Sequence, residues 1–232
     1  MTLKSSTAWI KGLAIASALF AVGACTATES TPDNPILRKF QWFSYLEGGD
    51  FKEACAAGAP GRYRMIYNGV YTEQVRVYDL HADTGRLDAR LILPADLRAF
   101  SIDGLSGLLN PWRGTPVSHT VQSAEAAAIV AALDADGAFG PPAVGLELPS
   151  MGFFWTIAAC HEGAYHFTAL AWPSPAWDAA TFDDALFAVD PINAAVNAPR
   201  ATKVTRDKRR AVRYNVVNEF VVKVGEHGLA GF

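Results

Sequence analysis

The stretch from Phe153 to Trp172 constrains the fold most, because it is the densest aromatic run of the chain and alternates on both sides of a turn. Its sequence is FFWTIAACHEGAYHFTALAW, and the central HEGA is typical of a tight turn between two strands. Pro173 and Pro175 end the second half, since proline cannot continue a sheet ladder. The stretch therefore predicts a β-hairpin at the centre of a hydrophobic core.

Three earlier segments show the same strand-like pattern. Residues 62–67, 74–77 and 86–93 alternate apolar and polar side chains with a period of two, and Arg76 belongs to the polar set. A regular alternation favours an antiparallel sheet with one face on the core and one face in water. We therefore expect a three-stranded meander with one solvated face.

Helical signals lie between the strands. The sequence predicts helices from Asn34 onward, from Asp50 to about Ala57, from Ser123 to Leu133 and from Thr181 to about Val189. Residues 94–121 are rich in glycine and proline, which predicts an irregular segment. The mixture indicates an α+β fold, with a curved antiparallel sheet of about seven or eight strands and three or four helices packed on it.

The first 25 residues carry an export signal. Lys4 and Lys11 accompany an apolar run from Gly12 to Ala24 that is too short to span a membrane. The run ends in Val22-Gly23-Ala24-Cys25, which resembles the lipobox of bacterial lipoproteins. The resemblance implies that Cys25 is acylated and becomes the mature N-terminus. Thr26, rather than aspartate, follows Cys25, which resembles lipoproteins sorted to the outer membrane. An ordinary signal peptide with an Ala-x-Ala-like cleavage site is the alternative.

This interpretation divides the chain into a signal peptide (residues 1–24), a lipidated flexible tether (25–33) and a single α+β domain (34–232). The 208 residues from Cys25 onward suit one domain with a sizeable core. Without Lys4 and Lys11 the formal net charge changes from −3 to −5, so we expect no nucleic-acid partner. The acyl chains on Cys25 would be the membrane anchor, at the periplasmic face of the outer membrane.

Once the lipobox takes Cys25, two cysteines remain in an exported chain, and an even number predicts one disulfide, between Cys55 and Cys160. The alternative is a catalytic thiol at Cys160 beside His161. Adjacent strand residues face opposite ways, so Cys160 and His161 are poorly placed to share a proton. Cys160 falls on the same side of the strand as the apolar residues that alternate with it, so we expect it to form the disulfide.

Two polar clusters are candidates for metal binding or proton transfer. Asp79, His81 and Asp83 alternate with a period of two, so they would share one face if the strand continued through them. A strand that runs into a polar turn gives the same pattern without a function. His161 and His166 flank the predicted hairpin turn, but they are five residues apart, whereas the HExxH zinc motif needs four on a helix.

The chain contains no nucleophile elbow, Walker loop or dinucleotide fingerprint. We therefore assign no catalytic residue and no cofactor. A basic run that includes Arg206, Lys208, Arg209 and Arg210 departs from the acidic remainder. In the cell envelope it could meet an acidic protein or anionic lipid, although a solvated linker is the commoner meaning of such a run.

The sequence thus favours a lipoprotein with an accessory or partner-binding role in the envelope and no catalysis. A carrier of a hydrophobic ligand is the first alternative, and it would need a cavity lined by Tyr63, Met65, Phe153 and Trp155. The second alternative is a metal-dependent or other hydrolase, which would need Asp79, His81 and His161 to converge.

Overall fold

The computed structural model describes residue 46 and residues 48–58, 61–92, 114–201 and 220–230, all within the unit Pro35–Phe232. In chain order the elements are α3 (Gly49–Ala56), β1 (Arg62–Gly69), β2 (Gln74–His81), β3 (Arg86–Ile92), β4 (Thr115–Thr120), α6 (Ser123–Ala135), β5 (Glu147–Pro149), β6 (Phe153–His161), β7 (Ala164–Trp172), α7 (Pro175–Ala179), α8 (Phe182–Phe187) and β8 (Val221–Lys223). None of the helices described is long and apolar enough to cross a membrane.

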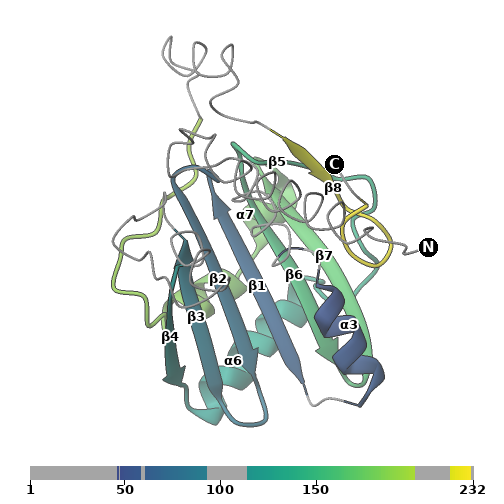
Figure 1. The fold of residues 1–232 in the computed structure, drawn as a ribbon, viewed down its shortest axis with the longest axis vertical. Coiled ribbons are helices and arrows are strands. Elements are labelled where there is room, and N and C mark those ends of the chain that lie inside the picture. Colours follow the sequence, from purple (N-terminus) through teal and green to yellow (C-terminus); the bar gives the residue numbers. More distant parts are fainter. Residues whose placement is uncertain (1–45, 47, 59–60, 93–113, 202–219, 231–232) are drawn as a thin grey trace, which may run out of the picture. The chain divides into compact units, whose positions relative to one another are not determined.

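The main sheet has six antiparallel strands in the order β4-β3-β2-β1-β6-β7, so β2 and β1 are its middle strands (Figure 1). The α+β class is confirmed. The expected single sheet of seven or eight strands is wrong for the described residues, because β5 and β8 pair with each other in a separate two-stranded sheet. Leu148 and Val222 of that small sheet are fully buried in a core shared with the main sheet, so it covers a face instead of extending an edge.

Both faces of strands β1 and β6 are covered. Side chains at odd positions of β1 and β6, such as Tyr67 and Trp155, pack in one core with residues of α6 and α8. Side chains at even positions, such as Ile66 and Phe154, pack in a second core with α3 and the β5–β8 sheet. We call these sides the α6 face and the α3 face. A solvated face is therefore confined to part of the sheet, because two layers cover its centre.

The hairpin predicted between Phe153 and Trp172 is confirmed. Strands β6 and β7 pair from Phe153 opposite Trp172 to His161 opposite Ala164. The two residues between the strands, Glu162 and Gly163, have φ angles of 50° and 78°. Positive φ at both central positions matches the right-handed twist of a two-residue hairpin, and a glycine adopts it at little cost.

Arg76 of β2 departs from the sequence-based expectation. Its side chain is fully buried on the α6 face. The guanidinium donates to the side chains of Gln74, Tyr78 and Asp190 and to the backbone carbonyl of Ala194. The expectation that Arg76 faces water is wrong, because the segment after α8 folds over β2 and supplies the acceptors.

Further contacts hold the same segment to the β1–β2 hairpin. The side-chain amide of Gln74 donates to the carbonyl of Ala195, and the backbone N–H of Asn197 donates to the Gln74 side chain. The hydroxyl of Tyr67 donates to the carbonyl of Asn197. Residues 190–200 thus form a strap, which we name the 190–200 strap, that closes one end of the α6 face.

Candidate functional site

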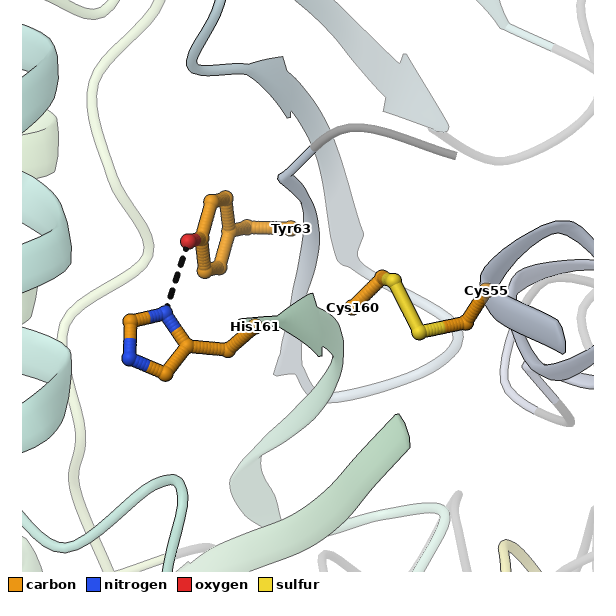
Figure 2. Close-up of a disulfide and its surroundings, with 4 residues drawn as sticks. All are labelled: Cys55, Tyr63, Cys160 and His161. Carbon is orange, nitrogen blue, oxygen red and sulfur yellow. Dashed lines mark hydrogen bonds between the residues drawn. A yellow bond between two sulfur atoms is a disulfide. The ribbon is translucent and has the colours of Figure 1, made fainter. Parts of the chain in front are cut away.

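The two cysteines of the domain and the histidine beside them lie on opposite sides of β6. Cys55 of α3 and Cys160 of β6 are joined at disulfide distance on the α3 face, with their Cα atoms 5.3 Å apart (Figure 2). His161 points the other way, and its Nδ1 atom lies 2.9 Å from the hydroxyl oxygen of Tyr63. The cysteine pairing that the sequence predicts is therefore present in the structure, and Cys160 is not a thiol that shares a proton with His161.

His161 belongs to a small aromatic group on the α6 face. The ring of Phe139 stacks on the His161 ring with centroids 3.9 Å apart and planes 12° apart, and the His166 ring lies 6.4 Å from His161. Burial lowers the pKa of His166, and the neighbouring His161 lowers it further. A hydrogen bond to the backbone of Phe139 raises the pKa, but it does not offset the other two effects. Stacking and hydrogen bonding give these histidines a packing role at the end of the hairpin.

Asp79 is engaged in an ion pair on the α3 face. Its two carboxylate oxygens accept from Nε and Nη2 of Arg64, at 2.7 and 3.2 Å, and Arg64 also contacts Asp50 of α3 at 3.0 Å. Burial lowers the pKa of Arg64, but the hydrogen bonds and charges of Asp79 and Asp50 outweigh it and raise that pKa overall. Asp79 therefore neutralises a guanidinium, and its oxygens are not free for a metal.

A groove of about 410 Å³ lies where the β2–β3 turn meets the end of β4. Two of the predicted residues, His81 and Asp83, line it. The other lining residues come from the turn, from β3 and from β4: Thr84, Arg86, Ser118, His119 and Thr120. We name this feature the β4 groove. Within the described ranges, no group of three or more His, Cys, Asp and Glu side chains is placed to hold a metal ion.

The register of the strands explains the groove's composition. His81 pairs with Arg86 across β2 and β3, and Arg86 pairs with Thr120 across β3 and β4. These three residues form one row across the sheet on the α3 face, with about 5 Å from strand to strand. In the next row, Asp88 accepts hydrogen bonds from Arg86 at 3.0 Å and from the hydroxyl of Ser118 at 2.6 Å.

The carboxylate of Asp88 is already neutralised. Burial raises its pKa, but the hydrogen bonds from Arg86 and Ser118, together with the charge of Arg86, outweigh burial and lower the pKa overall. Asp88, Arg86 and Ser118 are therefore bound to one another by hydrogen bonds. Any chemistry of the groove depends on its other lining residues.

Sequence reasoning missed five contributors to this groove: Thr84, Arg86, Ser118, His119 and Thr120. Residues Ser118 and His119 lie in β4, within a stretch that the sequence predicts to be irregular. The alternation of β3 does indicate that Arg86 and Asp88 share a face. The pairing of β3 with β4 joins residues about 30 positions apart, so no local sequence pattern predicts it.

The residues proposed to line a cavity for a hydrophobic ligand are packed. Tyr63, Met65, Phe153 and Trp155 are 4% exposed or less and belong to the core of the α6 face. The Trp155 ring contacts Phe182 of α8 edge to face, with centroids 5.1 Å apart. This side of the sheet is thus filled by the protein's own aromatic side chains.

The hydrolase alternative is not assembled either. Asp79 and His81 lie on the α3 face, whereas His161 lies on the α6 face with Tyr63. The sheet separates these side chains, so they do not converge on one cleft. Cys25 and the basic residues Arg206, Lys208, Arg209 and Arg210 lie outside the described residues.

Comparison with known proteins gives no relative: no protein-family model, no curated protein and no solved structure matches the chain.

Proposed function

We propose that the chain is an exported lipoprotein, acylated at Cys25 and held at the periplasmic face of the outer membrane, whose domain binds a partner and does not catalyse a reaction. The observation that carries the proposal is the use of the cysteines. Cys55 and Cys160 pair inside the domain, which leaves Cys25 of the lipobox as the third cysteine. A buried disulfide suits a compartment that is oxidising, as the export signal implies.

A binding role is favoured over catalysis by the state of the candidate catalytic groups. Asp79 is paired with Arg64, and His161 is stacked on Phe139 on the other face of the sheet. A general acid or base must reach its substrate from a cleft that it shares with other reacting groups. Within the described part of the chain, these groups are instead used to pack and neutralise the fold.

The two ends of the basic run are attached close together. On one side, Arg200 forms an ion pair with Glu73. On the other side, the ring of Phe220 contacts that of Tyr71 with centroids 5.2 Å apart. Glu73 and Tyr71 both belong to the turn between β1 and β2. Residues 202–219 hold six lysines and arginines against two acidic residues, so this run joins two points of one hairpin.

We assign the partner contact to Arg206, Lys208, Arg209 and Arg210 within this run. Guanidinium and ammonium groups bind carboxylate and phosphate strongly, so the partner would be an acidic envelope protein or anionic lipid headgroups. Anchoring both ends of the run to one hairpin reduces the conformational entropy that binding would otherwise remove.

The anchor is tested by intact mass spectrometry of the chain purified from bacterial membranes. We expect the mass of a chain that begins at Cys25 and carries acyl groups, and we expect a C25S variant to be found in the soluble fraction. The C55A/C160A variant is the matched control, because it also loses cysteines but should keep the acyl groups. An unmodified Cys25 in the purified chain would refute the lipoprotein proposal.

The partner contact is tested by chemical cross-linking in intact membranes. A K208Q/R209Q/R210Q variant should lose its cross-linked partner, and the partner's retention should fall steeply with salt concentration in the wild type. A K52Q/R90Q/K223Q variant, which removes the same number of charges from the described surface, should keep the partner. Equal retention in the two variants would contradict the assignment.

A further inference from the structure

Strand β4 forms one edge of the main sheet, and its outer side is accessible (Figure 1). Among the strands described, β4 pairs with β3 alone, and residues 116–120 are all exposed. The other edge strand, β7, differs, because Phe167 and Ala169 in its middle are buried. β4 is therefore the edge of the main sheet at which another strand has access to the backbone.

The hydrogen bonds to β3 determine which backbone groups of β4 face outward. The N–H of Val121 donates to the carbonyl of Gly85 at 2.8 Å, at the end of the β3–β4 ladder. Bonded and non-bonded pairs alternate along an antiparallel ladder. Residues 117 and 119 therefore also bond to β3, whereas the backbone groups of three residues point outward: Pro116, Ser118 and Thr120.

The position of Pro116 agrees with this assignment. Proline has no N–H, and it occurs in edge strands where that N–H would face outward. The outer side of β4 thus offers carbonyl groups at all three positions and donors at Ser118 and Thr120. Within the described ranges, neither of these two N–H groups has an acceptor. Pro116 also limits an added strand to a short contact, because it ends the row of donors.

We propose that two copies of the chain associate through β4, which pairs with β4 of the second copy in antiparallel orientation. With the two Ser118 residues opposite each other, each Ser118 N–H donates to the Ser118 carbonyl of the other copy. Each Thr120 N–H donates to the Pro116 carbonyl of the other copy. This register overlaps residues 116–120 and satisfies every outward donor, and the missing N–H of the proline falls at the two ends of the ladder.

The side chains and the length of β4 favour a second copy as the partner. The strand, TPVSHT, contains no charged residue, so two copies meet without like charges opposite each other. Within the described residues, Val117 is the one exposed large hydrophobic side chain of the main sheet, and it would lie opposite His119 of the second copy. Both strands are bounded by Pro116 and by helix α6, which begins at Ser123, so neither overhangs the other. The contact is smaller than a stable interface, so we expect association that rises with concentration.

The test is amide hydrogen exchange of the full chain in a neutral detergent, followed by NMR at increasing protein concentration. We expect exchange of the Ser118 and Thr120 N–H groups to slow as the concentration rises, because these groups are bonded in the dimer. The N–H groups of residues 117 and 119 bond to β3 in both states and are the internal control. Sedimentation at the same concentrations measures the mass of the dimer.

Two variants at one position separate the backbone from the side chain. S118P removes the outward N–H, as Pro116 does naturally. It should weaken dimerisation by about tenfold or more, because two hydrogen bonds between the copies are lost. S118A is the matched control, because it also loses the hydroxyl that donates to Asp88 but keeps the N–H, and it should dimerise as the wild type does. Both variants keep Cys25, so the comparison is independent of the lipoprotein proposal.

Three results would overturn the proposal. Rapid exchange of both N–H groups at every concentration would show that the edge stays open. Slow exchange at every concentration would show that another segment of the same chain covers the edge. Equal dimerisation of S118P and S118A would place the contact between copies elsewhere. The exchange measurement on the wild type keeps the test decisive even where S118P fails to fold.

Discussion

The guanidinium of Arg76 and the carboxylate of Asp190 form an ion pair whose side chains are 0% and 9% exposed. They come from β2 and from the 190–200 strap, which are more than 100 residues apart in the sequence. The hydroxyl of Tyr78 donates to the same carboxylate at 2.9 Å. A charge this deeply buried is tolerated only while its partners remain in place.

Replacement of Asp190 by alanine should therefore destabilise the domain strongly. We expect D190A to lower the free energy of unfolding by about 3–5 kcal/mol, because Arg76 would be left as an unpaired buried charge. Urea unfolding followed by tryptophan fluorescence measures the effect. The matched control is E147A, which removes a pair with Lys223 whose side chains are 60% and 57% exposed. It should cost less than about 1 kcal/mol, and equal costs would contradict the assigned role of the buried pair.

At Val70, replacement by glycine should destabilise the domain less than replacement by alanine, which is the reverse of the usual order within a strand. It begins the β1–β2 turn with φ at 64°, a left-handed conformation that is unfavourable for a β-branched residue, and its side chain is fully buried. Both substitutions remove buried methyl groups, but only glycine adopts this φ freely, so V70G should be more stable than V70A by about 1 kcal/mol.

Val77 provides the control for this comparison. It is 2% exposed and lies within regular strand β2. At this position V77G should be less stable than V77A by about 0.5–1 kcal/mol, because glycine loses more backbone entropy on folding. Thermal unfolding of the four variants gives both differences, and the same order at both positions would show that the Val70 backbone is not strained.

The disulfide should account for a large part of the stability. Cys55 and Cys160 are separated by 105 residues, and closing a loop of about this length stabilises by up to about 4.7 kcal/mol in the chain-entropy model. We expect the C55A/C160A variant to lose about 2–5 kcal/mol in urea unfolding. C25S should unfold as the wild type does under the same conditions, and a stable domain after loss of the pair would indicate that the core alone holds the fold.

Stability should fall in mild acid through His166. Its folded-state pKa is lowered, first by burial and then by His161, below the pKa of 6.5 that an ordinary histidine has in the unfolded chain. The unfolded chain therefore binds a proton first, so stability present above about pH 6.5 is lost as pH falls through the folded-state pKa. Tyr63, Glu162 and the Phe139 carbonyl are the other polar groups near the pair.

The measurement is the urea midpoint at a series of pH values from 8 to 5. H166Q should reduce the loss of stability across this range, because the titrating group is removed. H227Q is the control, since His227 is exposed on the segment after β8. A pH profile of H166Q that overlays the wild type would exclude His166 as the source of the acid sensitivity.

The hairpin and the meander could be predicted from the sequence because each follows local signals. Alternation set the strands, and the Glu162-Gly163 turn fixed the register of β6 on β7. Alternation also divides the residues of β2 between two faces of the sheet. It does not show that other parts of the chain cover both of these faces. Arg76 was consequently placed in water, because its acceptors come from Asp190 and Ala194, far along the chain.

Strand β4 could not be predicted for a different reason. Its sequence TPVSHT contains a proline and mostly polar side chains, and residues 116–120 are exposed at the edge of the sheet. A strand whose two faces are both exposed has no apolar alternation, because neither face packs on a core. The β4 groove depends on that strand, so Ser118 and His119 could not be grouped with His81 from sequence.

The link between Cys55 and Cys160 also determines how the domain would carry mechanical load. A pulling force applied to the chain before α3 reaches Cys55 and passes through the sulfur atoms directly into β6, which lies between β1 and β7 in the sheet. The segment between the two cysteines, which closes a sequence separation of 105, bears no tension while the bond is intact. This segment would span about 350 Å if fully extended, and it cannot extend while the bond is intact. A domain tethered by its N-terminal side would keep the segment between the two cysteines unextended until that bond is reduced.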